Sequence, residues 1–185
     1  MDHFYKNIPG FFGFGDIYQK MVQVAPSAAH FVEVGAFLGT SSAFMAVEIV
    51  NSKKKIQFDV VDYFQDNEFI KDRLKQKRIT GPQLQNFKRF TEPVKDVINL
   101  VILSSFEASQ RYKDKSLDFV FIDADHNYWS VLSDIKAWRP KIKTGGYIGG
   151  HDYCSAWPGV IKAVDEVFKK EERTISHISW LVKIK

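Results

Sequence analysis

Two short stretches of the sequence carry acids and histidines in a spacing that suits proton transfer or metal binding. "FIDADH" ends a predicted apolar strand with Asp123 and places His126 three residues later, and "GGHDY" ends the next predicted strand with His151 and Asp152. Neighbouring parallel strands lie about 4.8 Å apart, so we expect these side chains to converge at one edge of a sheet. Carboxylates with imidazole suit Mg²⁺ or Mn²⁺, and a histidine suits proton removal near neutral pH.

These residue types predict specific roles and leave alternatives open. We assign Asp123 and His126 catalytic roles, with His126 as general base, and we assign Asp123, His151 and Asp152 as metal ligands. Alternatively, His126 caps the following helix, Asp123 binds a cofactor amine or the substrate without a metal, and His151 packs beside Tyr147.

A glycine-bearing loop, "EVGAFLGTS", reads as strand, Gly-x-x-x-Gly turn and helix. Gly35 and Gly39 allow the backbone to approach a ligand closely, and the helix start, capped by Thr40 or Ser41, offers free N–H groups to a carboxylate or phosphate. Phe37 occupies the second glycine position of the dinucleotide fingerprint, and the phosphate loop ending in Gly-Lys-Ser/Thr is absent. The loop is therefore a poor pyrophosphate cradle.

Two further acids accompany this loop. Asp62 ends the next predicted strand, 27 residues after Gly35, where a carboxylate can bind both ribose hydroxyls or merely cap the strand end. Glu33 stands inside an apolar strand, and we expect it to pair with a cationic part of a cofactor, with capping of nearby backbone N–H groups as the alternative.

The elements that must position these residues alternate along the chain. Strands are predicted over residues 31–34, 56–62, 97–105, 116–125 and 147–152, and helices over 16–24, 40–50, 128–138 and from residue 158 onward. Alternating strands and helices predict a mostly parallel sheet covered on both faces, with ligands bound outside the carboxyl ends of the strands. "TISHISWLVKIK" closes the chain, and it lacks Gly, Asn or Pro between its halves. We expect either a very tight hairpin or the loss of one strand there.

Composition bounds the class of protein. The chain has 185 residues, 45% hydrophobic and 15% aromatic, which predicts a single domain over residues 1–185. Residues 1–27 form a helical segment in which "PGFFGFGDIY" is either a lid or an apolar anchor. A net charge of +4 permits an anionic substrate without indicating nucleic acid. The single Cys154 forms no internal disulfide, and no signal peptide or membrane-length apolar run is present, so we expect a cytoplasmic protein with no membrane partner.

Three stretches together resemble a known family. "FVEVGAFLGTSS", "LDFVFIDADHNYWSVLSDIKAWRPKIKTGGYIGGHDY" and "PGVIKAVDEVF" are similar to class I S-adenosylmethionine-dependent methyltransferases, and most to small-molecule O-methyltransferases acting on sugars and macrolide sugars. The resemblance covers about residues 30–170. It implies a Rossmann-like, doubly wound α/β fold with a mostly parallel seven-stranded sheet and an antiparallel last strand. It also implies S-adenosylmethionine as cofactor, with Glu33 and Gly35 at its methionine part, Asp62 at its ribose and Ser105 near its adenine.

The resemblance also implies an activity. It indicates methyl transfer to a hydroxyl of a small molecule, a saccharide or polyol first and a catechol-like phenol second, with His126 as base. His151 stands where related metal-dependent enzymes carry an oxygen ligand, which leaves Mg²⁺, Mn²⁺ or no metal open. Two other functions remain as alternatives: a nucleotide-dependent oxidoreductase, and a non-catalytic S-adenosylmethionine-binding accessory protein.

The remaining features concern partners. The chain contains no Asn/Asp-Pro-Pro-aromatic motif and no evident recognition domain, which argues against a nucleic-acid acceptor. The basic run 71–78 is interpreted as a solvated helix face, or as a rim for an anionic substrate. The oligomeric state is left open, a homo-oligomer included.

Overall fold

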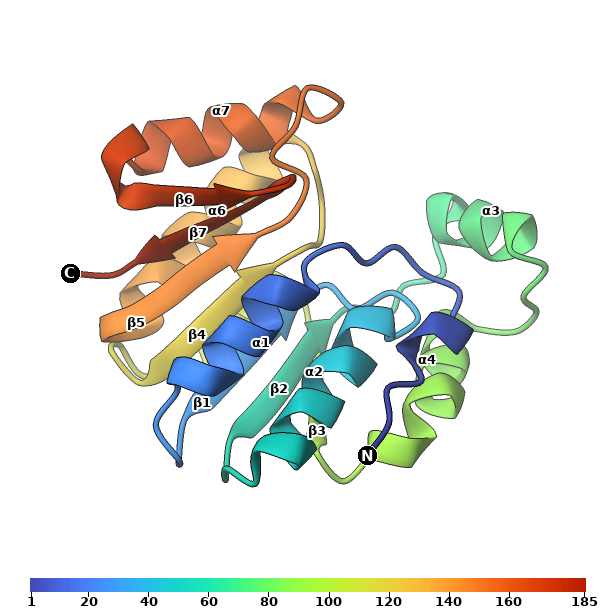
Figure 1. Ribbon diagram of the computed structural model, residues 1–185. Coiled ribbons are helices and arrows are strands. Elements are labelled where there is room, and N and C mark those ends of the chain that lie inside the picture. The colour runs from blue at the N-terminus through green and yellow to red at the C-terminus, as the bar shows by residue number, and fades with distance from the viewer.

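A computed structural model describes all 185 residues and contains one seven-stranded sheet in the order β3-β2-β1-β4-β5-β7-β6 (Figure 1). The strands are His30–Val34 (β1), Gln57–Asp62 (β2), Ile98–Ile102 (β3), Leu117–Ile122 (β4), Ile142–Gly150 (β5), Arg173–Ser176 (β6) and Ser179–Lys183 (β7). β1 to β5 pair in parallel, and β7 runs antiparallel to both of its neighbours. The Rossmann-like fold and its antiparallel last strand are therefore confirmed.

Helices follow the strands in alternation and cover both faces of the sheet (Figure 1). They are Gly15–Val24 (α1), Thr40–Ser52 (α2), Glu68–Gln76 (α3), Gln83–Thr91 (α4), Ser105–Ser109 (α5), Tyr128–Trp138 (α6) and Pro158–Val167 (α7). Short 3-10 turns lie at Tyr5–Asn7, Glu92–Val94, Arg139–Lys141 and Lys170–Glu172. None of these helices combines the length and the apolar composition of a membrane-spanning segment.

The two-residue period of the strands divides the core into two layers. Phe119 and Phe121 of β4 pack with α1 and α2 on one face, whereas Val120 and Ile122 pack with α6 and α7 on the other. Because both faces are buried, the central strands read as continuous apolar runs. Such two-sided packing holds the carboxyl ends of the strands in fixed relative positions.

The strand predicted over residues 97–105 differs from the structure. β3 ends at Ile102, α5 begins at Ser105, and the side chain of Ile102 is 47% exposed. The physical reason is the strand order, because β3 lies at the sheet edge and has β2 as its single neighbour. The residues that follow β3 are therefore at the surface.

The end of the chain forms a very tight hairpin, which is one of the two predicted arrangements. Ser176 of β6 pairs with Ser179 of β7, so only two residues, His177 and Ile178, make the turn. His177 takes a positive φ of 53° without being glycine. Both strands of the hairpin are present, and the seventh strand is not lost.

Candidate active site

The register of the sheet brings three strand ends side by side. Val34, Ile122 and Gly150 are partners across β1, β4 and β5. The next backbone N–H groups continue the ladder, since Asp123 N donates to Val34 O at 2.8 Å and His151 N donates to Ile122 O at 3.1 Å. Gly35, Asp123 and His151 therefore follow directly at one edge, as the sequence predicts.

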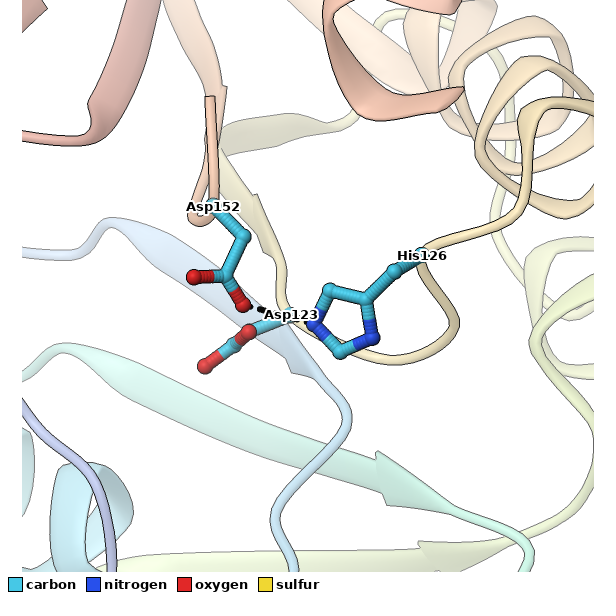
Figure 2. Close-up of side chains that lie close together, drawn as sticks. All are labelled: Asp123, His126 and Asp152. Carbon is cyan, nitrogen blue, oxygen red and sulfur yellow. Dashed lines mark hydrogen bonds and ion pairs between the residues drawn. The ribbon is translucent and has the colours of Figure 1, made fainter. Parts of the chain in front are cut away.

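An acid–histidine cluster forms at the ends of β4 and β5 (Figure 2). His126 Nε2 lies 2.6 Å from Asp152 Oδ2, and ligand atoms of Asp123, His126 and Asp152 all lie within 4.8 Å of one another. His151 Nδ1 lies 3.4 Å from Asp152 Oδ1 and 3.7 Å from Asp123 Oδ1. All four predicted side chains converge, but the set with metal-binding spacing contains His126 in place of His151.

The charges of this cluster act differently on His151 than on the three residues with metal-binding spacing. Burial alone would lower the pKa of His151, but its contacts with Asp123 and Asp152 outweigh burial and raise that pKa to about 9. Burial likewise opposes ionisation of Asp152, yet contacts with His126 and His151 hold the pKa of this carboxyl well below its usual range. The two carboxylates thus favour the protonated form of His151, which would have to lose its proton to bind a metal, and its role as a metal ligand stays a prediction.

His126 is fixed from two sides. Asp152 binds its Nε2, and the indole of Trp157 stacks on its ring with centroids 4.1 Å apart and planes 24° apart. The start of α7 also lies close, since a Cβ on Gly159 would lie 2.6 Å from the His126 carbonyl oxygen. Figure 2 shows Nδ1 of His126 on the side away from both carboxylates. No hydrogen bond within the protein engages that nitrogen, and its contact with a substrate stays a prediction.

A small pocket lies beside the cluster. It is lined by Ile122, Asp123, Ala124, Asp125, His126, Val131, His151, Val160 and Trp180. Its polar side chains come from the loops after β4 and β5, and its apolar side chains come from the strands and from α6 and α7. The pocket is smaller than a typical ligand cavity, so it marks where these polar and apolar groups converge and is not by itself a ligand-binding site.

Close protein packing accounts for both glycines of the loop. Gly35 and Gly39 both have φ of +89°. A Cβ on Gly35 would lie 2.1 Å from the Asp123 carbonyl oxygen, and one on Gly39 would lie 2.5 Å from Thr91 Cγ2. The loop is therefore pressed against β4 and α4, and its contact with a cofactor stays a prediction.

Asp62 ties this loop to the end of β2. Its Oδ2 accepts hydrogen bonds from Ala36 N at 2.8 Å and Phe37 N at 3.1 Å, and its Oδ1 accepts one from Phe64 N at 2.7 Å. Burial raises the pKa of Asp62 although these hydrogen bonds act to lower it. The strand-end cap is thus present in the structure, and the ribose contact stays a prediction.

Glu33 is the centre of a buried hydroxyl cluster. Its side chain is 1% exposed, and it accepts hydrogen bonds from Tyr18 Oη at 2.8 Å and from Ser42 Oγ. Burial raises the pKa of Glu33 to about 7, against the lowering effect of Ser41, Ser42 and Tyr18. Hydroxyls bind Glu33 where the alternative interpretation placed backbone N–H groups. The expected contact of Glu33 with a cofactor stays a prediction. The sequence analysis missed Tyr18, whose signal is a polar tip on the apolar face of α1.

The cap of α2 differs from the prediction. Gly39, in the left-handed conformation, occupies the N-cap position, and no side chain caps the helix. Thr40 Oγ1 instead donates to Ile8 O at 3.4 Å, and the Ser41 hydroxyl lies near enough to Glu33 to lower the pKa of that acid. The physical reason is that both hydroxyls find buried acceptors outside the helix, so the first N–H groups of α2 keep no side-chain partner.

Ser105 begins α5 and faces α6. Its Oγ accepts a hydrogen bond from Trp138 Nε1 at 2.9 Å, and it also contacts Asp134. The hydroxyl is thus engaged within the protein, and its predicted place near adenine stays a prediction.

The aromatic N-terminal segment combines an anchor with an exposed tip. Phe14 is 1% exposed, and its ring lies 4.9 Å from that of His151 and 4.5 Å from that of Phe121. Phe11, three residues earlier, is 65% exposed. Phe14 fits the anchor interpretation, whereas movement of this segment as a lid stays a prediction.

Known proteins share part of this sequence and its fold. A methyltransferase-domain family matches residues 32–153. An uncharacterized protein of Acanthamoeba polyphaga mimivirus is 29% identical over 139 residues, which are 74% of this chain and 58% of that protein. This chain therefore spans little more than half the length of that relative.

Solved structures share the fold. The O-methyltransferase NovP has a TM-score of 0.65 and 20% identity, over 92% of this chain and 79% of NovP. CalS11, a TDP-rhamnose 3′-O-methyltransferase in calicheamicin biosynthesis, has a TM-score of 0.60 and 15% identity, over 91% of this chain and 76% of CalS11. The matched residues, 32–153, are more than half of the chain and include the glycine loop, Asp62, Asp123 and Asp152. This chain therefore belongs to the methyltransferase-domain family.

Proposed function

We propose that this chain transfers a methyl group from S-adenosylmethionine to a hydroxyl oxygen of a small molecule, a saccharide or polyol first and a catechol-like phenol second. The observation that carries the proposal is the hydrogen bond of 2.6 Å between Asp152 and His126 at the carboxyl edge of a methyltransferase sheet. The O-methyltransferase NovP and the sugar O-methyltransferase CalS11 share this fold and support an oxygen acceptor.

The chain's own residues supply a base and its counter-charge. With Nε2–H donated to Asp152, the Nδ1 lone pair of His126 can take the proton of an acceptor hydroxyl. The carboxylate then stabilises the imidazolium that forms, and the stack with Trp157 keeps the ring in place. S-adenosylmethionine supplies the methyl group, and the acceptor oxygen replaces its sulfur at the methyl carbon.

The proposed cofactor position follows the strand ends. The first N–H groups of α2, at Thr40 and Ser41, have no side-chain partner and suit the cofactor carboxylate. Gly35, Gly39, Glu33 and Asp123 would surround its amino-acid part, Asp62 its ribose and Ser105 its adenine. This placement needs Asp62 to exchange part of its backbone hydrogen bonding for ribose hydroxyls.

A divalent cation is compatible with the donor set. Asp123, His126 and Asp152 offer two carboxylate oxygens and one ring nitrogen within 4.8 Å, a combination that suits Mn²⁺ or Mg²⁺. Such an ion would polarise the acceptor oxygen. It would also compete with the Asp152–His126 hydrogen bond, because both use the same side chains.

Calorimetry with S-adenosylhomocysteine, in the presence and absence of Mn²⁺, tests the proposal. We expect binding in both conditions, and Asp62→Asn should weaken it by about tenfold, the effect of losing one charge-assisted hydrogen bond. Asp96→Asn serves as the control, because Asp96 lies just before β3, at the amino ends of the strands. Absence of binding, or binding of a nicotinamide cofactor instead, contradicts the proposal.

A further inference from the structure

The exposed aromatic side chains of this protein are unevenly distributed. All large ones lie on segments at the carboxyl edge of the sheet: Phe11, Tyr63, Phe69, Phe106, Trp129 and Trp157. Exposed rings in one region mark a contact surface better than scattered ones do. Two of them, Phe11 and Phe69, also lie beside the side chains of Arg73 and Lys77.

Helix α3 presents two adjacent stripes. Ile70 and Leu74, four residues apart, face inward and pack near Leu38 of the glycine loop. A second stripe, toward solvent, is formed by Phe69 and Arg73 of α3 and by Lys77 at its C-cap, again four residues apart. The inner stripe anchors α3 on the loop, so the outer stripe has a fixed place beside it.

Phe11 completes this outer stripe. The Arg73 guanidinium carbon lies 5.0 Å from the Phe69 ring centre and 5.6 Å from the Phe11 ring centre, and Lys77 Nζ lies 4.5 Å from that of Phe11. The side chains of Phe11 and Phe69 nevertheless stay 65% and 59% exposed. We call Phe11, Phe69, Arg73 and Lys77 the aromatic–cation stripe.

The cations of the stripe have no acidic partner. Lys71, on another side of α3, pairs with Glu68 at 2.7 Å, whereas Arg73 and Lys77 form no ion pair. Two rings that stay more than half exposed and two cations without an ion pair complement a planar base joined to phosphates. A sugar or polyol alone would use neither feature fully.

The stripe is close to the acid–histidine cluster. The N-terminal segment runs across this end of the sheet between α1 and α3 (Figure 1). Phe11 belongs to the stripe and Phe14 contacts His151, and their Cα atoms are at most about 11 Å apart because only three peptide units join them. One extended ligand can therefore span from the stripe to the cluster.

We infer that the aromatic–cation stripe binds the nucleoside diphosphate part of a nucleotide-linked acceptor, while the linked saccharide or polyol presents its hydroxyl to His126. The inference rests on the proposed function and narrows its substrate class. The base stacks on Phe11 or Phe69, and the phosphates pair with Arg73 and Lys77.

Titration with uridine diphosphate and thymidine diphosphate tests the inference without turnover. We expect both to bind the wild-type protein, and Arg73→Gln with Lys77→Gln to weaken binding by about tenfold or more. The matched control, Lys71→Gln with Lys75→Gln, removes the same charge from the same helix and should change binding less than twofold. Phe69→Leu, which keeps apolar area without a ring, should weaken binding by about fivefold. Thermal melts check that each variant folds.

Other outcomes overturn the inference. Equal affinity for inorganic pyrophosphate reveals an anion site without base stacking, and much tighter binding of single-stranded RNA identifies a nucleic-acid surface. Binding of S-adenosylhomocysteine without any binding of the nucleoside diphosphates refutes the stripe alone. Failure of S-adenosylhomocysteine to bind refutes the proposed function separately, because the two ligands are measured independently.

Discussion

The two halves of the carboxyl edge hold their acidic side chains in different ways. At β1 and β2, Glu33 binds hydroxyls and Asp62 binds backbone N–H groups, so fixed neutral donors satisfy both. At β4 and β5, Asp152 is satisfied by two histidines, which can themselves gain or lose protons. The first half thus holds its acids with hydroxyl and backbone donors, whereas the second half holds Asp152 with imidazole rings.

The difference follows from what lies against each half. The glycine loop is compressed between β4 and α4, where backbone groups are near enough to serve as donors. The loops after β4 and β5 bring only side chains together, and these are partly exposed. Substitutions in the first half should therefore affect stability most, and substitutions in the second half should affect rate.

Gly35→Ala should have the largest effect. The added Cβ would lie 2.1 Å from the Asp123 carbonyl oxygen at a φ of +89°, so we expect the free energy of unfolding to fall by more than about 3 kcal/mol. Urea denaturation measures it. Gly145→Ala is the control, since Gly145 has a φ of +86° with open space around it and should cost about 1–2 kcal/mol. Equal losses would mean that the loop is not compressed.

Asp152→Asn should separate rate from cofactor affinity. Removing the charge that holds His126 and faces His151 should lower kcat about 100-fold or more, with S-adenosylhomocysteine affinity almost unchanged. Initial rates with the hydroxyl acceptor and calorimetry measure the two quantities. Asp114→Asn, whose carboxylate is 69% exposed and pairs with Lys141, is the control. A wild-type kcat would remove His126 from its assigned role.

Glu33→Gln should change how stability depends on pH. The folded pKa of about 7 lies above the ordinary value of 4.5, so the stabilisation is fully present below pH 4.5 and is lost as the pH rises through 7. Between pH 4.5 and 8 we expect the wild-type free energy of unfolding to decline relative to the variant by up to about 3 kcal/mol. Chemical denaturation at several pH values measures it, and parallel curves would show that Glu33 ionises normally.

Trp157→Ala should have the smallest effect. Loss of the stack on His126 should lower kcat by about three- to tenfold, because the ring is less well held. Trp157→Phe keeps a stacking ring and should recover most of the rate. Equal rates for Trp157→Ala and the wild-type protein would show that the stack does not hold His126 for catalysis.

Much of the fold was predictable from local pattern. The helix over Tyr128–Trp138 has the predicted bounds, because its apolar residues recur at helical spacing and Pro140 follows it. The position of β3 was not predictable, since its apolar run is typical of a buried strand and only the strand order places it at the edge. Likewise, the distant acceptors that draw Thr40 and Ser41 from the helix cap have no local signal.

The sequence by itself determined the family, the alternation of strands and helices, and which acids and histidines stand at strand ends. Tertiary structure alone decided their partners: Glu33 with Tyr18, Asp62 with the glycine loop, and Asp152 with both His126 and His151. The physical reason is the separation along the chain over which each effect acts. Periodicity and turn chemistry act over a few residues, whereas a pKa or a hydrogen bond depends on groups that only folding brings within about 4 Å.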